Sequence, residues 1–61
     1  MYEKYEELLK IKGVTSADVS RATGIAESAI ANWKRRRTIM KAINLKLLAD
    51  YFNVPMEYFL S

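Results

Sequence analysis

Six cations lie close together in the middle of this sequence, and no acid lies among them. Residues 33–46 carry a net charge of +6, whereas residues 1–32 carry −1 and residues 47–61 carry −2, which gives +3 in total. The six cations are Lys34, Arg35, Arg36, Arg37, Lys41 and Lys46. Positive charge focused on one segment is what a polyanion site requires. A basic loop that only faces water has the same composition, so the surrounding elements must decide.

The residue types that most catalytic and metal sites use are missing. The sequence contains no His and no Cys, which excludes disulfides, cysteine–metal sites and imidazole chemistry. It has no glycine-rich loop that could cradle a phosphate, and carboxylates alone on so small a domain lack a pocket. We therefore expect no enzymatic activity, no cofactor, no metal and no small-molecule substrate.

The elements that must position the cations follow a helical pattern throughout. Apolar residues recur at helical spacing, and Gly13, Gly24 and Asn53 are suited to end helices. Thr15 and Asp18 resemble a capping box with Asp in place of Glu. The expected helices cover residues 2–12, a segment from Thr15-Ser16 to Gly24, Glu27–Trp33, residues 42–52 and a terminal turn over 56–60. No stretch alternates long enough for a strand, so the sequence predicts an all-α fold of five short helices, with 1–61 as a single domain.

The second and third helices are joined by a tight turn that contains Gly24, as in a helix-turn-helix unit. Gly24 would accept a backbone angle that side chains resist, and Ala22 is small enough to let the helices approach. The space between the helices would be filled by Val19, Ile25, Ile30 and Trp33. Because Trp33 follows Ile30 by three residues, we expect it in the core rather than stacked on a base. This packing would turn the outer face of residues 27–32 outward, where it could enter a major groove.

Nearly the whole chain resembles the Cro and lambda-repressor-like helix-turn-helix family. The matching stretches are Glu6–Thr15, Val19–Ile25, Ile30–Lys34 and Leu48–Pro55. The resemblance implies a lambda-repressor-like DNA-binding domain and a repressor or activator that acts as a dimer on a palindromic operator. It also implies that the third helix reads bases, while the start of the second helix and the loop after the third hold phosphates.

The residue roles that the resemblance implies can be named by position. The base-contacting residues would be Glu27, Ser28 and Asn32. The phosphate-contacting residues would be Thr15, Ser16, Lys34, Arg35, Arg37 and Lys41. Glu27 could instead be a first-turn acid that stabilises its own helix. Thr15 and Ser16 could be N-cap residues, a role that is compatible with phosphate contact. The role of Arg36 also stays open.

The sequence departs from the family after Trp33. The family has a glycine three residues further on and a proline four beyond that, where this chain has Arg36 and Met40. Since no Gly or Pro lies between Ile25 and Val54, helices three and four could fuse into one rod from Ser28 to Tyr51, roughly 36 Å long at about 1.5 Å per residue. Such a rod would split the core and favour a domain-swapped dimer. The alternative is a compact monomer fold with a tight turn.

Two functions from different classes follow. The first is sequence-specific binding of double-stranded DNA by a cytoplasmic, phage-type transcriptional repressor, a homodimer. The alternative is a protein-interaction module, antitoxin-like or domain-swapped, which apolar exposure of Ile39, Met40 and Ile43 would favour. The start Met1-Tyr2-Glu3-Lys4 is not typical of a signal peptide, and no apolar run could span a bilayer, so we expect no membrane partner.

Overall fold

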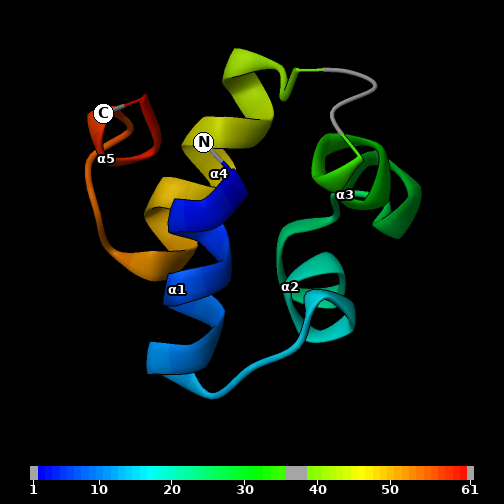
Figure 1. The fold of residues 1–61 in the computed structure, drawn as a ribbon, viewed down its shortest axis with the longest axis horizontal. Helices are drawn as coiled ribbons and strands as arrows, with labels where there is room; N and C mark the ends of the chain where they lie inside the picture. Colours follow the sequence, from blue (N-terminus) through cyan, green and yellow to red (C-terminus); the bar gives the residue numbers. More distant parts are fainter. Residues whose placement is uncertain (1, 36–38, 61) are drawn as a thin grey trace.

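Five helices make up the part of the chain that the structure, a computed structural model, describes: residues 2–35 and 39–60. They are α1 (Tyr2–Lys12), α2 (Ser16–Thr23), α3 (Glu27–Lys34), α4 (Ala42–Phe52) and α5 (Glu57–Leu60). These residues contain no strand, so the prediction of an all-α fold with five short helices is confirmed. Helices α2 and α3 lie beside the group formed by α1, α4 and α5, with α2 packed against α4 and α1 against α5 (Figure 1). Within the described ranges, no helix is long and apolar enough to cross a membrane.

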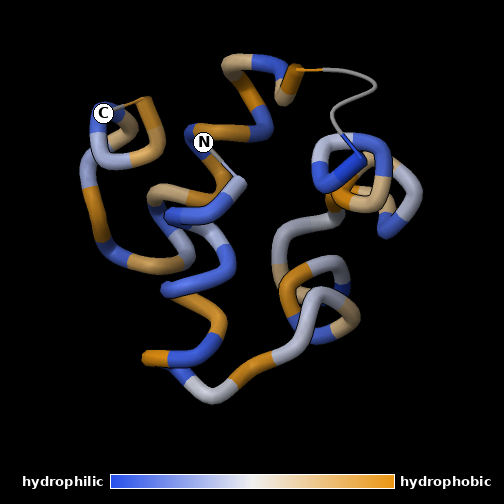
Figure 2. Tube along the Cα trace, in the orientation of Figure 1, coloured by the Kyte–Doolittle hydropathy of each residue, from blue (hydrophilic) through white to orange (hydrophobic). Residues whose placement is uncertain are grey.

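One apolar core holds all five helices together. Figure 2 shows apolar and polar residues mixed along the chain, as expected where each helix buries only one side. The centre of the core is aromatic: the Trp33 ring lies 5.4 Å from the rings of Tyr2 and Tyr5, and 6.4 Å from that of Phe59. The buried side chains are Tyr5, Leu8, Val19, Ile25, Ile30, Trp33, Met40, Leu45, Leu48, Ala49 and Phe59. Among the described residues, no polar or charged residue is buried.

The C-terminal helices end and begin where the sequence predicts. Asn53 follows α4 in the left-handed conformation, with φ of 58°, and its N–H donates to the carbonyl oxygens of Ala49 and Asp50. Pro55 lies just before α5, and its carbonyl accepts from the N–H of Tyr58. The short C-terminal helix therefore turns back over α1, which places Phe59 in the core.

Helices α3 and α4 are separate, so the rod from Ser28 to Tyr51 is not formed in this chain. Helix α3 ends at Lys34, and α4 begins only at Ala42, after Lys41 in an extended conformation with ψ of 149°. The physical reason lies at Met40, which is 6% exposed and belongs to the core. Burying this side chain outweighs the helix propensity of Met40 and Lys41. Of the three residues whose exposure would favour a protein-interaction module, Met40 is therefore buried, whereas Ile39 and Ile43 are exposed.

Two neighbouring leucines of α4 provide a matched test of this core. Leu48 is fully buried and Leu47 is 38% exposed. We expect Leu48→Ala to lower the free energy of unfolding by about 2–5 kcal/mol, because it removes buried methyl groups and leaves a cavity. Leu47→Ala should change it by less than about 1 kcal/mol. Urea denaturation followed by circular dichroism measures both, and equal losses in the two variants would contradict the described packing.

Candidate nucleic-acid interface

The turn between α2 and α3 depends on the backbone conformation of Gly24. Its φ is 81°, and its N–H donates to the carbonyl of Ser20 as the C-cap of α2. A β-carbon built at Gly24 would meet nothing within 4 Å. Glycine is therefore favoured here because its backbone accepts the left-handed region, and not because space is short.

Two hydroxyl groups fix the chain after this turn. Ser20 Oγ donates to the carbonyl of Ile25 across 2.6 Å. Thr23 Oγ1 donates to the carbonyl of Val19 and accepts from the N–H of Ile25, at 2.7 and 3.2 Å. Sequence reasoning missed these bonds, although Ser and Thr beside a turn often bond to nearby backbone. Together they set the direction in which the chain enters α3.

The packing between α2 and α3 follows the predicted residues with one exception. Val19, Ile25, Ile30 and Trp33 are all buried, as expected. Ala22, however, is exposed, so the prediction that its small size allows the two helices to approach is wrong. Val19, about one turn earlier, is the buried residue of α2.

One face of α3 is left open by this packing. Ser28, Asn32 and Arg35 follow one another at steps of four and three residues, so they share a helix face. That face points away from Ile30 and Trp33. Ser28 and Arg35 are exposed and Asn32 is partly exposed. The structure thus brings two of the predicted base-contacting residues to the same side as the predicted phosphate contact Arg35.

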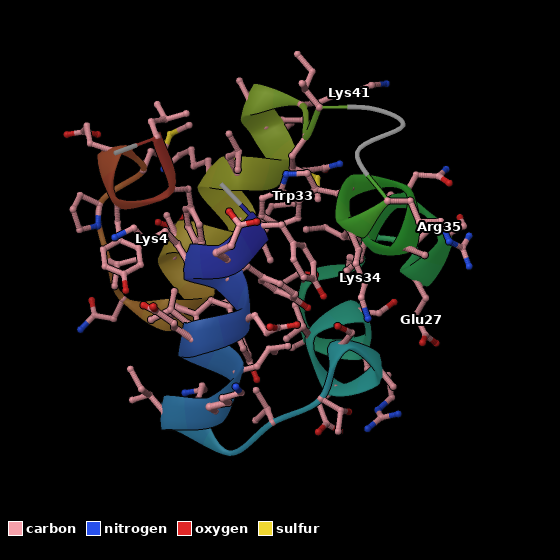
Figure 3. All side chains as sticks on the ribbon, viewed as in Figure 1. Lys4, Glu27, Trp33, Lys34, Arg35 and Lys41 are labelled. Carbon is pink, nitrogen blue, oxygen red and sulfur yellow. The ribbon has the colours of Figure 1, made fainter. Side chains whose placement is uncertain are left out.

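Cations flank this open face. Lys34 and Arg35 end α3, and Lys41, at the start of α4, is also exposed. Figure 3 shows Glu27 and Arg35 on the outer side of α3, Lys41 above them and Trp33 directed inward, with Lys4 on the opposite side of the molecule. Arg36 and Arg37 lie outside the described residues, as does Thr38.

The start of α3 carries no capping side chain. Ala26 is the N-cap residue and makes no side-chain hydrogen bond to the first turn. Exposed Glu27 supplies the acid of that turn, where a negative charge stabilises a helix. The Glu27 side chain can therefore stabilise α3 and still lie at the edge of its open face.

The start of α2 is closed by a capping box, as predicted. The Thr15 hydroxyl accepts from the N–H of Asp18, and the Asp18 carboxylate accepts from the N–H and the hydroxyl of Thr15. The hydroxyl of Ser16 shares a hydrogen bond of 2.7 Å with the buried Tyr5. Thr15 thus has the alternative capping role, while the Ser16 hydroxyl can take part in a further hydrogen bond.

A match to a protein-family model shows which family the chain belongs to. The family model described as helix-turn-helix, of the Cro/C1 type, matches residues 6–59. The chain belongs to this helix-turn-helix family. No curated protein and no solved structure matches the chain. The family is one of DNA-binding transcription regulators and not typically of enzymes.

Hydrogen bonding lowers the pKa of Asp18 in this helix-turn-helix domain. The backbone N–H of Thr15 has the largest effect, the Thr15 hydroxyl adds to it, and the nearby Arg21 guanidinium acts in the same direction. A carboxyl whose pKa is lower in the folded state stabilises the fold while it is ionised. This contribution is present above the ordinary value of 3.8 and is lost as the pH falls through the lowered pKa.

Asp18→Asn should therefore remove part of the acid sensitivity of the fold. We expect the variant to be less stable than the parent at neutral pH, because the amide caps α2 less well than a carboxylate. The difference in stability between the variant and the parent should shrink as the pH falls below the ordinary pKa of an aspartate carboxyl. Thermal unfolding from neutral to strongly acidic pH measures it. The control is Asp50→Asn, which removes an exposed carboxylate 3.5 Å from Lys46. Its thermal unfolding midpoint should differ between acidic and neutral pH by as much as that of the parent.

Proposed function

We propose that this chain binds a specific sequence of double-stranded DNA by inserting the open face of α3 into the major groove. The observation that carries this proposal is the position of Ser28 and Asn32 on the side of α3 opposite to Ile30 and Trp33, next to the exposed cation Arg35. A major groove admits an α-helix, and each base pair presents a distinct pattern of donors and acceptors there. Membership of the helix-turn-helix family supports the same function.

Three side chains would read the bases. The Asn32 amide can donate to N7 and accept from the N6 amino group of one adenine, and the Ser28 hydroxyl can donate or accept. Glu27 can accept from the N4 amino group of cytosine. Because Ser28 and Asn32 are one turn apart on one face, they would contact neighbouring base pairs.

Phosphates would be held on both sides of these base contacts. Lys34, Arg35, Arg37 and Lys41 would supply the charge on one side. On the other side, the start of α2 would offer the Ser16 hydroxyl and the first N–H groups of the helix, which have no acceptor within it. Thr15 would contribute there if its bonds to Asp18 rearranged. Cationic contacts release counterions, so the affinity would fall steeply as salt increases.

Regulation would follow from occupancy of the site. A protein bound across a promoter excludes the polymerase, so we propose repression as the outcome. Two copies would bind half-sites about 34 Å apart, one turn of the duplex. The domain of residues 1–61 would act in the cytoplasm, where the DNA is, without a cofactor.

Arg35→Ala tests the phosphate contacts. We expect weaker binding to every duplex, with a salt slope that is smaller by about one, because one fewer counterion is released. Fluorescence anisotropy on a random duplex at several salt concentrations measures both quantities. Lys4→Ala has the same net charge but changes the opposite side of the molecule (Figure 3), so it should bind like the parent. Parent protein that fails to bind duplex DNA even at low salt would refute the proposed function.

Asn32→Ala tests the reading of bases. Selection from a pool of random duplexes should return a consensus from the parent, and a broader one from the variant at a single position. The loss for the preferred sequence should be about 1–3 kcal/mol, because a bidentate contact is removed. Affinity for a non-specific duplex should stay the same. An unchanged consensus would show that Asn32 does not read a base.

A second candidate function is protein interaction, with weak DNA binding or none. The exposure of Ile39 and Ile43, which are 83% and 69% exposed, supports it. An antitoxin-like module would use such a surface for a partner protein. A domain-swapped assembly stays a prediction whose test is oligomeric mass.

A further inference from the structure

Tyr5 of α1 links the aromatic centre of the core to the start of α2. Its side chain is fully buried, and its hydroxyl lies 2.7 Å from Ser16 Oγ. The Tyr5 ring lies 5.4 Å from the rings of Tyr2 and Trp33, and 6.0 Å from that of Phe52. Packing against three aromatic neighbours leaves the ring little freedom to turn. The hydroxyl is therefore held in one place, directed at Ser16.

The burial of Tyr5 decides which hydroxyl donates in this hydrogen bond. A buried donor without an acceptor costs free energy, whereas a hydroxyl near the surface can bond to water. Among the described residues, the Tyr5 hydroxyl bonds only to Ser16. If Ser16 donated to Tyr5, the proton of the buried hydroxyl would be left without an acceptor. Tyr5 therefore donates and Ser16 Oγ accepts.

This direction leaves the Ser16 proton available for another acceptor. A serine hydroxyl has one proton and two lone pairs, and Ser16 is partly exposed. A phosphate of DNA is an anion, so a hydrogen bond to it needs a donor from the protein. Ser16 is already arranged as such a donor. Thr15 is not, because its hydroxyl proton is used on the carboxylate of Asp18.

The two hydrogen bonds of Ser16 would strengthen one another. Hydrogen bonds that form a chain polarise their members. By donating to Ser16 Oγ, Tyr5 makes the Ser16 O–H a better donor to a phosphate oxygen. The Tyr5 ring also packs on Trp33 of α3. One buried side chain thus contacts both the helix that would read bases and a residue that would hold a phosphate.

We propose that Tyr5 is a positioning residue for DNA binding: its buried hydroxyl donates to Ser16 Oγ and so directs the Ser16 proton at a phosphate of the duplex. This inference rests on the proposed function and deepens it, because it adds a residue that acts without touching DNA. A phosphate contact carries no sequence information. The contribution of Tyr5 is therefore the same for every duplex.

Tyr5→Phe tests the proposal, with Tyr2→Phe as the matched control. Each variant loses one hydroxyl and keeps a ring whose parent lies 5.4 Å from Trp33, and neither changes the net charge at neutral pH. Fluorescence anisotropy with a random duplex should show binding about two- to fivefold weaker for Tyr5→Phe, because less than one full neutral hydrogen bond is lost. Its salt slope should equal that of the parent, because no cation is removed. Tyr2→Phe should bind like the parent.

A double-mutant cycle with Ser16→Ala separates positioning from a general effect on the fold. Ser16→Ala removes the donor itself, so it should weaken binding at least as much as Tyr5→Phe does. Adding Tyr5→Phe to Ser16→Ala should cause no further loss, because the two hydroxyls act as one chain. Thermal unfolding gives a second measurement. Ser16→Ala should have a lower midpoint than Tyr5→Phe, because it leaves the buried hydroxyl without a partner, and the double variant should recover part of that loss.

Three results would overturn the proposal and leave the proposed function intact: a Tyr5→Phe variant that binds like the parent, equal losses in Tyr5→Phe and Tyr2→Phe, or losses that add in the double variant. A parent that binds no duplex even at low salt would instead refute the proposed function, and the inference would fall with it. Circular dichroism at the temperature of the titrations shows that each variant compared is folded.

Discussion

The contact between Trp33 and the aromatic side chains of α1 and α5 determines how α3 is presented. Helix α3 has only eight residues, and a helix of this length is not stable in water without tertiary packing. Its indole lies against Tyr2 and Tyr5 near the N-terminus and against Phe59 near the C-terminus. The two ends of the chain thus hold the helix that would enter DNA. The outward direction of Ser28 and Asn32 is a consequence of the inward direction of Trp33.

Specific capping residues close the ends of the short helices in this domain. Thr15 and Asp18 close the start of α2, Gly24 closes its end, and Asn53 closes α4. Each cap provides a hydrogen-bond partner for backbone groups at a helix end that would otherwise bond to water. Around the α2–α3 turn, side-chain hydroxyls bond to backbone groups in the same way. In a chain of 61 residues, where the core is small, these local bonds are a large part of what selects one arrangement.

Helices whose apolar residues repeat regularly and whose ends carry Gly or Asn could be predicted from the sequence. The separation of α3 from α4 could not, because Arg, Met and Lys have good helix propensity, whereas the buried position of Met40 depends on the folded core. The exposed position of Ala22 was not predictable either, because spacing alone does not fix which side of a short helix is buried. The hydroxyl bonds of Ser20 and Thr23 depend on turn geometry that spacing does not give. The open face of α3 was predictable, since Ile30 and Trp33 fix its opposite side, while the roles of its residues stay predictions.

The inward position of Trp33 has a spectroscopic consequence. It is the single tryptophan of the sequence and is 4% exposed, so its fluorescence emission reports an apolar interior next to tyrosines rather than the open face of α3. A base cannot stack on it while the domain is folded. A change in emission on adding duplex DNA would therefore report movement of α3 against α1, which makes this residue an internal probe of whether the helix-turn-helix docks as a rigid unit.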